Sequence, residues 1–240
     1  MNIGLEWKKM KRTGFFLAFL ASGILASAFP VLNMAVRSES YVNIPSTSVN
    51  ILLGANWQSM AMLNILLAVA GACIMYHTEY ADQAIQKMCT LPISEHTMFF
   101  AKFLIMTAMF LVVFTVEAIA ILLCSQHWFE AYSDMYMELM KNFGFLFLLM
   151  LPAILLSLMI ASACKNMWIS LGIGIVLIFL ATMLPIQDFV WTLFPYTLPY
   201  QIFSQQTSQA IGHYAIAVAS ELALIAIAEI IFLKVRRSFQ

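Results

Sequence analysis

The chain has 240 residues, of which 62% belong to the apolar and aromatic set AVILMFWYC and 10% are charged, and its mean hydropathy is +0.88. A water-soluble domain averages about 45–50% apolar and 25% charged residues, so this composition excludes a soluble globule. The apolar residues occur in runs of about 20, the length that crosses a hydrocarbon core of about 30 Å as a helix. A transmembrane barrel would show segments of about 10 residues that alternate in polarity, and the run Phe145–Ala163 does not alternate. The sequence predicts an all-α polytopic membrane protein.

The first twelve residues predict an amphipathic helix at the membrane surface. Its apolar side chains fall on one side and its basic side chains spread over the other: Ile3, Trp7 and Met10 against Lys8, Lys9, Lys11 and Arg12. A basic face suits the anionic inner leaflet, and Trp suits the headgroup level. Two alternatives remain, namely positive charge that only flanks a span and a signal peptide cleaved near Ala26-Ser27-Ala28. The apolar run continues past that motif to Val36, which favours a span.

Six apolar runs predict six transmembrane helices in a single permease domain of residues 1–240. The runs are Phe15–Val36, Trp57–Tyr76, Phe99–Ser125, Asn142–Cys164, Met167–Ile186 and Tyr214–Leu233. The stretches between them are shorter than the roughly 40 residues that an unassisted soluble domain needs. We therefore expect no appended enzyme or receptor domain in this chain.

The basic residues predict how these spans are oriented. Ten of the twelve lie on the side of both termini: Lys8, Lys9, Lys11, Arg12, Lys87, Lys102, Lys165, Lys234, Arg236 and Arg237. Arg37 and Lys141 lie on the other side. Because an excess of Lys and Arg marks the cytoplasmic side, both termini should be cytoplasmic.

The inner connection between the second and third spans predicts a second amphipathic helix. The pattern reads as a helix over Glu79–Leu91, a break at Pro92, and Ser94 as the N-cap of the next helix. Apolar side chains share one side of the first helix, and polar ones lie elsewhere. Such a helix suits docking into the groove of a partner protein, or it rests on the membrane surface.

Three carboxylates fall within the apolar runs, where an ionisable group costs about 3 kcal/mol and is a functional candidate by default. Glu229 lies near the inner surface, where we expect it beside Lys234 or other C-terminal cations. Glu117 and Glu221 fall in the outer half. Together with Asn56 and Asn64 of the second span they are candidates for a polar cavity. The alternative is that these carboxyls are structural, either protonated or paired with polar neighbours.

The outer connection over Gln187–His213 is too apolar for a solvated loop and contains two prolines. One interpretation is a re-entrant pair of short helices that dip back into the outer leaflet, where such backbone must be buried against protein. The other is an aromatic belt at the interface. The residues concerned are Trp191, Phe194, Pro195, Tyr196, Pro199 and Tyr200.

No pattern predicts catalysis, a nucleotide site or a metal site. A P-loop needs Gly-Lys-Ser/Thr, and none of the nine glycines precedes a lysine. The four histidines are scattered between both faces, and the four cysteines lack zinc-ligand spacing. We expect free thiols, no metal, no cofactor in this chain and no nucleic-acid partner.

The order of these parts resembles the permease subunit of type-2 ABC exporters. The resemblance is carried by two stretches, Leu5-Glu6-Trp7-Lys8-Lys9-Met10-Lys11-Arg12 and the stretch from Glu79 through Leu91-Pro92-Ile93-Ser94 to Lys102. It covers essentially the whole chain. The small size and the lack of a fused ATPase are similar to the permeases of bacterial lantibiotic-immunity and bacitracin-resistance systems.

This resemblance implies a complex of two permeases, identical or related, with two ABC ATPase subunits in the bacterial plasma membrane. The chain would be a transport permease and not an enzyme, with ATP and Mg²⁺ bound by the partner ATPase. It implies an elbow helix over Ile3–Arg12, an outer gate over Asp188–Ser208, and a coupling helix whose ATPase-binding residues are Glu79, Asp82, Ile85, Met88 and Leu91.

The implied function is ATP-driven export of a membrane-active, lantibiotic-like peptide or similar amphiphile, which gives immunity or resistance. The alternative is an intramembrane enzyme or an accessory membrane scaffold without transport activity. The absence of paired catalytic groups at matching depth argues against the enzyme.

Overall fold

The computed structural model describes residues 3–11, 13–81, 95–130, 132–164, 166–184, 191 and 193–238. Those residues form helices and turns, with no strand among them. The helices are α1 (Ile3–Met10), α2 (Phe15–Val42), α3 (Ser48–Ala81), α5 (Glu95–Trp128), α6 (Met135–Ala163), α7 (Met167–Met183) and α9 (Ser208–Ser238), with two 3-10 turns, η1 (Leu198–Tyr200) and η2 (Phe203–Gln205).

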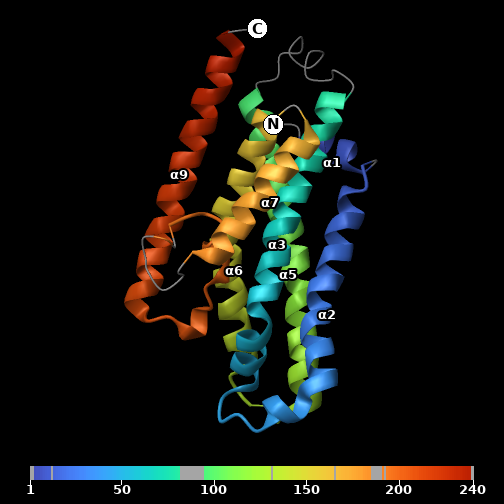
Figure 1. The fold of residues 1–240 in the computed structure, drawn as a ribbon, viewed down its shortest axis with the longest axis vertical. Helices are drawn as coiled ribbons and strands as arrows, with labels where there is room; N and C mark the ends of the chain where they lie inside the picture. Colours follow the sequence, from blue (N-terminus) through green and yellow to red (C-terminus); the bar gives the residue numbers. More distant parts are fainter. Residues whose placement is uncertain are drawn as a thin grey trace.

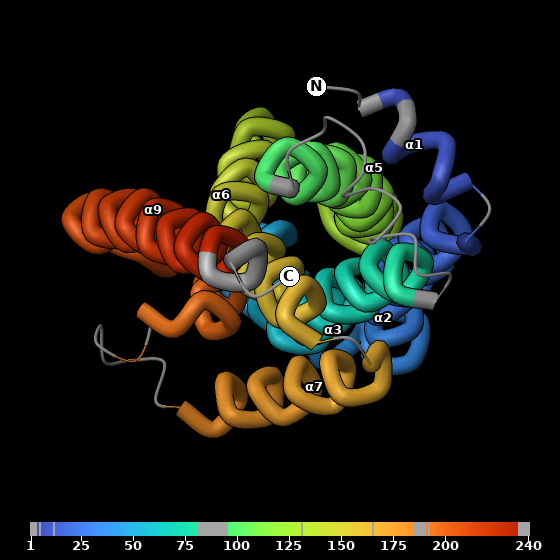
Figure 2. Tube along the Cα trace, turned by 90° about the horizontal axis from the view of Figure 1, so that it is seen from above, coloured from blue at the N-terminus to red at the C-terminus, as the bar shows by residue number. Residues whose placement is uncertain are grey.

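The long helices stand side by side along the longest axis of the molecule (Figure 1). The helices α3 and α6 form the centre, because α3 packs on α2, α5, α6 and α7, and α6 carries α9. Seen from above, α2, α7 and α9 lie at the periphery (Figure 2). In the apolar 18-residue stretch of α3, 67% of the residues are buried, whereas in the corresponding stretches of α2 and α9 28% are buried. The apolar faces that α2 and α9 leave exposed suit contact with lipid.

The bundle has two ends, which we name the terminal end and the far end. The terminal end holds α1, the end of α3, the beginning of α5 and the C-terminal turns of α9 (Figure 1). The far end holds the α2–α3 turn and the α5–α6 turn.

Each of the six predicted spans coincides with one helix, and five of those helices are long and apolar enough to cross a membrane. The remaining one, α7, is apolar but has 17 residues. Several helices extend well beyond the predicted spans. For example, α3 begins at Ser48 and not at Trp57. Hydropathy locates only the part of a helix that matches the hydrocarbon core, whereas the helical hydrogen bonds continue through polar residues beyond it.

Close helix contacts in the bundle depend on glycine. A Cβ added at Gly174 on α7 would lie 2.3 Å from Cγ1 of Val69 on α3. A Cβ at Gly71 on α3 would lie 2.8 Å from the ring of Phe19 on α2. Small residues allow helix backbones to approach closely in membranes, and here they hold α7 and α2 against α3.

Candidate functional site

Four charged side chains from three helices form one group at the terminal end, which we name the charge cluster: Glu6, Lys9, Glu79 and Lys102. The Lys102 Nζ lies 2.7 Å from Oε1 of Glu79 and 3.4 Å from Oε2 of Glu6. The Lys9 Nζ lies 2.5 Å from Oε1 of Glu6 and 3.4 Å from Oε1 of Glu79. Each lysine therefore contacts both carboxylates, and the four formal charges cancel.

The charge cluster is mostly removed from solvent. The side chain of Lys102 is 1% exposed, and those of Glu79 and Glu6 are 4% and 6% exposed, whereas Lys9 is at the margin with 30%. The Lys102 Nζ also lies 5.0 Å from the centre of the Tyr76 ring, within reach of a cation–π contact. A buried ammonium is tolerated only when its charge is paired, and this arrangement supplies two carboxylates and an aromatic face.

The helix α1 meets the bundle through Met10 and Glu6, which are the buried ones among its described side chains. Trp7 is 38% exposed, and its ring contacts that of Phe16 at 4.6 Å between centroids. Lys8 and Lys11 are exposed, whereas Arg12 and the side chain of Ile3 lie outside the described residues. The sequence pattern assigned Glu6 to neither side of this helix and placed Lys9 on the basic side; in the structure both side chains turn toward the charge cluster.

The coupling helix predicted over Glu79–Leu91 is described only at its start. Glu79 belongs to the last turn of α3, and its carboxylate is buried in the charge cluster. The predicted contact residues Asp82, Ile85, Met88 and Leu91 lie outside the described residues.

A second polar group links α3, α6 and α9 at the same end. The Tyr80 hydroxyl donates to the backbone oxygen of Ser162, and the Ser162 hydroxyl donates to Oε1 of Glu229 at 2.7 Å. Glu229 is 2% exposed. Glu229 thus accepts a hydrogen bond from a serine on α6; the side chains of Arg236 and Arg237 lie outside the described residues, so its expected pairing with C-terminal cations stays a prediction.

Two of the predicted cavity residues meet in the interior. Asn64 on α3 and Glu117 on α5 are both 0% exposed, and Nδ2 of Asn64 donates to Oε2 of Glu117 at 3.2 Å. The carboxamide oxygen Oδ1 of Asn64 and the second carboxylate oxygen Oε1 of Glu117 are both buried. Neither has a hydrogen-bond partner in the part of the chain that the structure describes. If Oε1 of Glu117 carries a proton, the carboxyl group becomes a hydrogen-bond donor. It could then donate to Oδ1 of Asn64, and both oxygens would have a partner.

The other two predicted cavity residues have separate surroundings. Asn56 accepts from Nδ2 of Asn33 at 3.0 Å and donates to the backbone oxygen of Leu52 at 2.8 Å. Glu221 on α9 is 7% exposed, and neither carboxylate oxygen has a hydrogen-bond partner among the described residues. Among the described residues, the structure therefore brings Asn64 and Glu117 into contact, whereas Asn56 and Glu221 have other neighbours. That these four residues line a polar cavity stays a prediction.

The segment predicted as an outer gate packs against protein. Tyr196 is 0% exposed, and its hydroxyl lies 2.9 Å from Oγ of Ser157, a residue in the last two turns of α6 toward the terminal end. Nε1 of Trp57 on α3 donates to the backbone oxygen of Pro199 at 3.1 Å. The described part of the chain between α7 and α9 therefore packs into the bundle through η1 and η2. Residues 185–190 and 192, including Asp188 of the predicted gate, lie outside the described residues, so the re-entrant pair of short helices stays a prediction.

The aromatic residues of this segment are divided between two environments. Pro199 and Tyr200 are buried with Tyr196, whereas Trp191 is 48% exposed and Phe194 is half-buried. Tyr196 and Tyr200 are therefore not part of an aromatic belt at the membrane interface. Pro195 lies in the turn that leads into η1.

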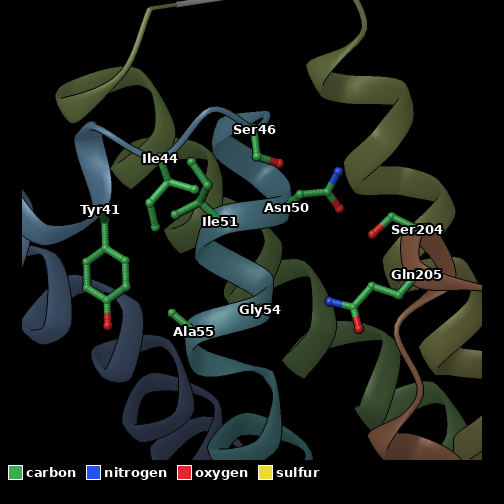
Figure 3. Close-up of a pocket in the computed structure, with 9 residues that line it drawn as sticks. All are labelled: Tyr41, Ile44, Ser46, Asn50, Ile51, Gly54, Ala55, Ser204 and Gln205. Atoms are coloured by element: carbon green, nitrogen blue, oxygen red, sulfur yellow. The ribbon is translucent and has the colours of Figure 1, made fainter.

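A pocket of about 490 Å³ opens at the far end, over the first turns of α3. Figure 3 shows Tyr41 and Ile44 on one side of α3 and Ser204 and Gln205 on the other, with Asn50 and Gly54 between them. Its lining side chains carry hydroxyl, amide and aliphatic groups and no formal charge: Tyr41, Ile44, Ser46, Asn50, Ile51, Gly54, Ala55, Ser204 and Gln205. None of the four predicted cavity residues lines this pocket.

The carboxylate of Glu138, near the pocket, accepts hydrogen bonds from two polar side chains. Oε1 of Glu138 accepts from Oγ1 of Thr47 at 3.1 Å, and its other oxygen accepts from the Tyr132 hydroxyl. Partial burial and the Glu138 carboxylate raise the pKa of Tyr132 to about 12, so the phenol remains protonated at neutral pH.

Sequence reasoning missed the roles of Glu6 and Lys102. Lys102 was counted only as a flanking positive charge, although it falls inside the predicted third span. A lysine within an apolar run needs a buried carboxylate partner, and that requirement was a usable signal. The identity of the partners was beyond the sequence, because Glu6 lies on another helix far away in the chain.

The family model described as "ABC-2 family transporter protein" matches residues 2–181. No curated protein and no solved structure matches the chain. The matched region contains the charge cluster, the Asn64–Glu117 pair, the long helices α2, α3, α5 and α6, and most of α7. The chain therefore belongs to the ABC-2 family of transporter proteins, as a multi-pass helical membrane subunit.

Proposed function

We propose that this chain is the permease of an ATP-driven exporter that removes a membrane-active, lantibiotic-like peptide or a similar amphiphile and so gives immunity or resistance. It assembles with a second permease, identical or related, and with ABC ATPase subunits that bind ATP and Mg²⁺. The terminal end faces the cytoplasm of a bacterial cell. The ATPase docks on the segment Glu79–Leu91.

Family membership supports the partnership with an ATPase. ABC-2 proteins are transmembrane subunits, typically non-catalytic, and the ATPase is a separate subunit. The first residue of the proposed docking segment, Glu79 at the end of α3, and Lys102 beyond its other end, near the beginning of α5, both belong to the charge cluster. This is the observation that carries the docking assignment, because a partner that pushes on an anchored segment moves the helices to which it is anchored.

The charge census supports the orientation. Lys8, Lys9 and Lys102 lie on elements of the terminal end, whereas Arg37 and Lys141 lie toward the far end, on α2 and α6. Positive residues concentrate on the cytoplasmic side of bacterial membrane proteins.

The far-end pocket supports an amphiphilic cargo. Its neutral polar and aliphatic lining suits a molecule that lies at a membrane interface with one apolar side. The helix α3 has 34 residues, or about 51 Å at 1.5 Å per residue, so its first turns reach beyond a hydrocarbon core of about 30 Å.

The docking assignment is tested by adding charge to the apolar side of the segment. Ile85→Asp with Met88→Asp would bury two charges in an ATPase groove, and we expect the permease to insert but no longer co-purify with its ATPase. Gln83→Asp with Gln86→Asp adds the same charge to the polar side and serves as the control. Normal co-purification of the first variant would place the segment at the membrane surface instead.

The cargo assignment is tested in cells that express the chain with its ATPase. We expect protection against amphipathic antimicrobial peptides that act on membranes and no protection against small hydrophilic antibiotics. Protection must disappear when the ATPase carries an inactive nucleotide site. Equal protection against both compound classes would contradict the proposed cargo.

A further inference from the structure

The charge cluster joins three parts of the chain that are far apart in sequence. Glu6 and Lys9 lie on α1, Glu79 lies in the last turn of α3, and Lys102 lies in the second turn of α5. The segment 82–94 begins just after α3 and ends just before α5. The cluster thus connects α1 to both flanks of this segment.

The contacts do not divide into two separate ion pairs. Oε1 of Glu79 receives both lysines, Lys102 at 2.7 Å and Lys9 at 3.4 Å. Glu6 also receives both, Lys9 on one oxygen and Lys102 on the other. A closed ring of alternating charges results, in which moving any one helix changes two contacts at once.

A buried charge group of this kind is a poor source of stability, because desolvation offsets most of the attraction and apolar residues would pack equally well. Its best-attested use is to specify how elements register against one another. Lys102 is suited to that use, since it can move closer to one carboxylate as it leaves the other, without losing a counter-charge.

The other groups around Lys102 are compatible with such an exchange. The Tyr76 ring faces its ammonium at 5.0 Å, and the rings of Tyr76 and Tyr80 are neighbours on α3, tilted by 30° with centroids 6.4 Å apart. On the far side of Tyr80, the Ser162 hydroxyl and the Glu229 carboxylate form their own hydrogen bond.

We infer that the ring of Glu6, Lys9, Glu79 and Lys102 acts as one unit that transmits motion of the ATPase-docking segment to α1, with Lys102 as its positioning residue. This inference rests on the proposed function, because the docking of an ATPase on segment 79–91 supplies the motion. It adds the residues through which docking and α1 are coupled.

Charge reversal distinguishes a four-membered ring from independent pairs. The swap Glu79→Lys with Lys102→Glu would preserve an isolated pair. In the ring it sets the new cation at position 79 against Lys9 and the new anion at position 102 against Glu6. Reversal of all four, by adding Glu6→Lys and Lys9→Glu, restores the alternation.

The functional readout is cargo exported per ATP hydrolysed by the reconstituted permease–ATPase complex. We expect the two-residue swap to lower this ratio about tenfold and the four-residue reversal to recover it to within about twofold. A two-residue swap variant with the wild-type ratio would overturn both the ring and the positioning role of Lys102.

A milder variant keeps the test informative if the reversed chains fail to insert. Lys9 is partly exposed, so Lys9→Gln should leave assembly intact while it leaves two carboxylates with one lysine, and the export ratio should fall. Lys8→Gln removes a neighbouring exposed charge outside the ring and should leave the ratio unchanged. Equal ratios for the two variants would contradict the inference.

A measurement on the permease alone separates this inference from the proposed function. The thermal stability of the chain in lipid nanodiscs should fall in the two-residue swap and recover in the four-residue reversal, whether or not an ATPase is present. If wild-type complexes show no ATP-dependent export, the proposed function fails and transmission fails with it. The stability pattern tests the ring independently of the ATPase, and its absence would reject the ring.

Discussion

Asn64 and Glu117 face each other across α3 and α5, with both side chains fully buried and one hydrogen bond of 3.2 Å between them. Each retains an acceptor oxygen without a partner among the described residues. A protonated carboxyl and a carboxamide can form two reciprocal hydrogen bonds, which would satisfy both oxygens. We therefore interpret Glu117 as a structural group that pins α3 to α5.

This interpretation predicts that Glu117→Gln is tolerated, because a second carboxamide supplies the same donor and acceptor without a carboxyl proton. Asn64→Leu should destabilise the chain by about 1–3 kcal/mol, because it leaves a buried carboxyl without a partner. Thermal unfolding in nanodiscs measures both variants. A fall in the export of cationic but not neutral cargo by an intact Glu117→Gln complex would show that Glu117 is ionised and contacts cargo.

The contact between α7 and α3 predicts a steric effect at Gly174. Gly174→Ala adds a methyl group 2.3 Å from Cγ1 of Val69, a β-branched side chain that rotates poorly, so overpacking should cost about 1–3 kcal/mol. Val69→Ala combined with Gly174→Ala should recover most of this loss. Gly172→Ala is the matched control on the same helix, since no atom lies within 4 Å of its added Cβ. Equal stability of the two alanine variants would contradict the close approach.

The segment between α7 and α9 predicts an asymmetry between two deletions of one hydrogen bond. The Ser157 hydroxyl donates to the backbone oxygen of Ala153 at 2.7 Å, so the Tyr196 hydroxyl is the donor to Ser157. Tyr196→Phe removes that donor cleanly and should cost about 0.5–1.5 kcal/mol. Ser157→Ala leaves a buried phenol without an acceptor and should cost about 1–3 kcal/mol. Stability measurements that rank the two in the opposite order would place the segment outside the bundle.

The orientation predicts which residues reagents reach in intact cells. On a background lacking the native cysteines, Ser46→Cys in the α2–α3 turn should react with a membrane-impermeant maleimide from outside. Lys8→Cys on α1 should react only after permeabilisation. The reverse pattern would invert the topology and remove the ATPase-docking assignment.

Much of this protein could be predicted from the sequence, because the information concerned is local. A run of apolar residues marks a helix that lipid can surround, and five of the six predicted runs lie on helices long enough to cross a membrane, whereas α7 is shorter. The lack of a nucleotide motif and the parts around Glu79 and Trp7 indicated a type-2 ABC permease, and the ABC-2 family match confirms that class.

The tertiary structure decided which side chains meet. The partners of Lys102 are Glu79 on the preceding helix and Glu6 on α1, and the Tyr196 hydroxyl bonds to Ser157 on α6. In a membrane every helix is apolar on most sides, so amphipathic periodicity does not reveal which face packs inward. Pairing then depends on close contacts such as that of Gly174 with Val69 and on the need of each buried charge for a partner, and both arise only when the helices are assembled.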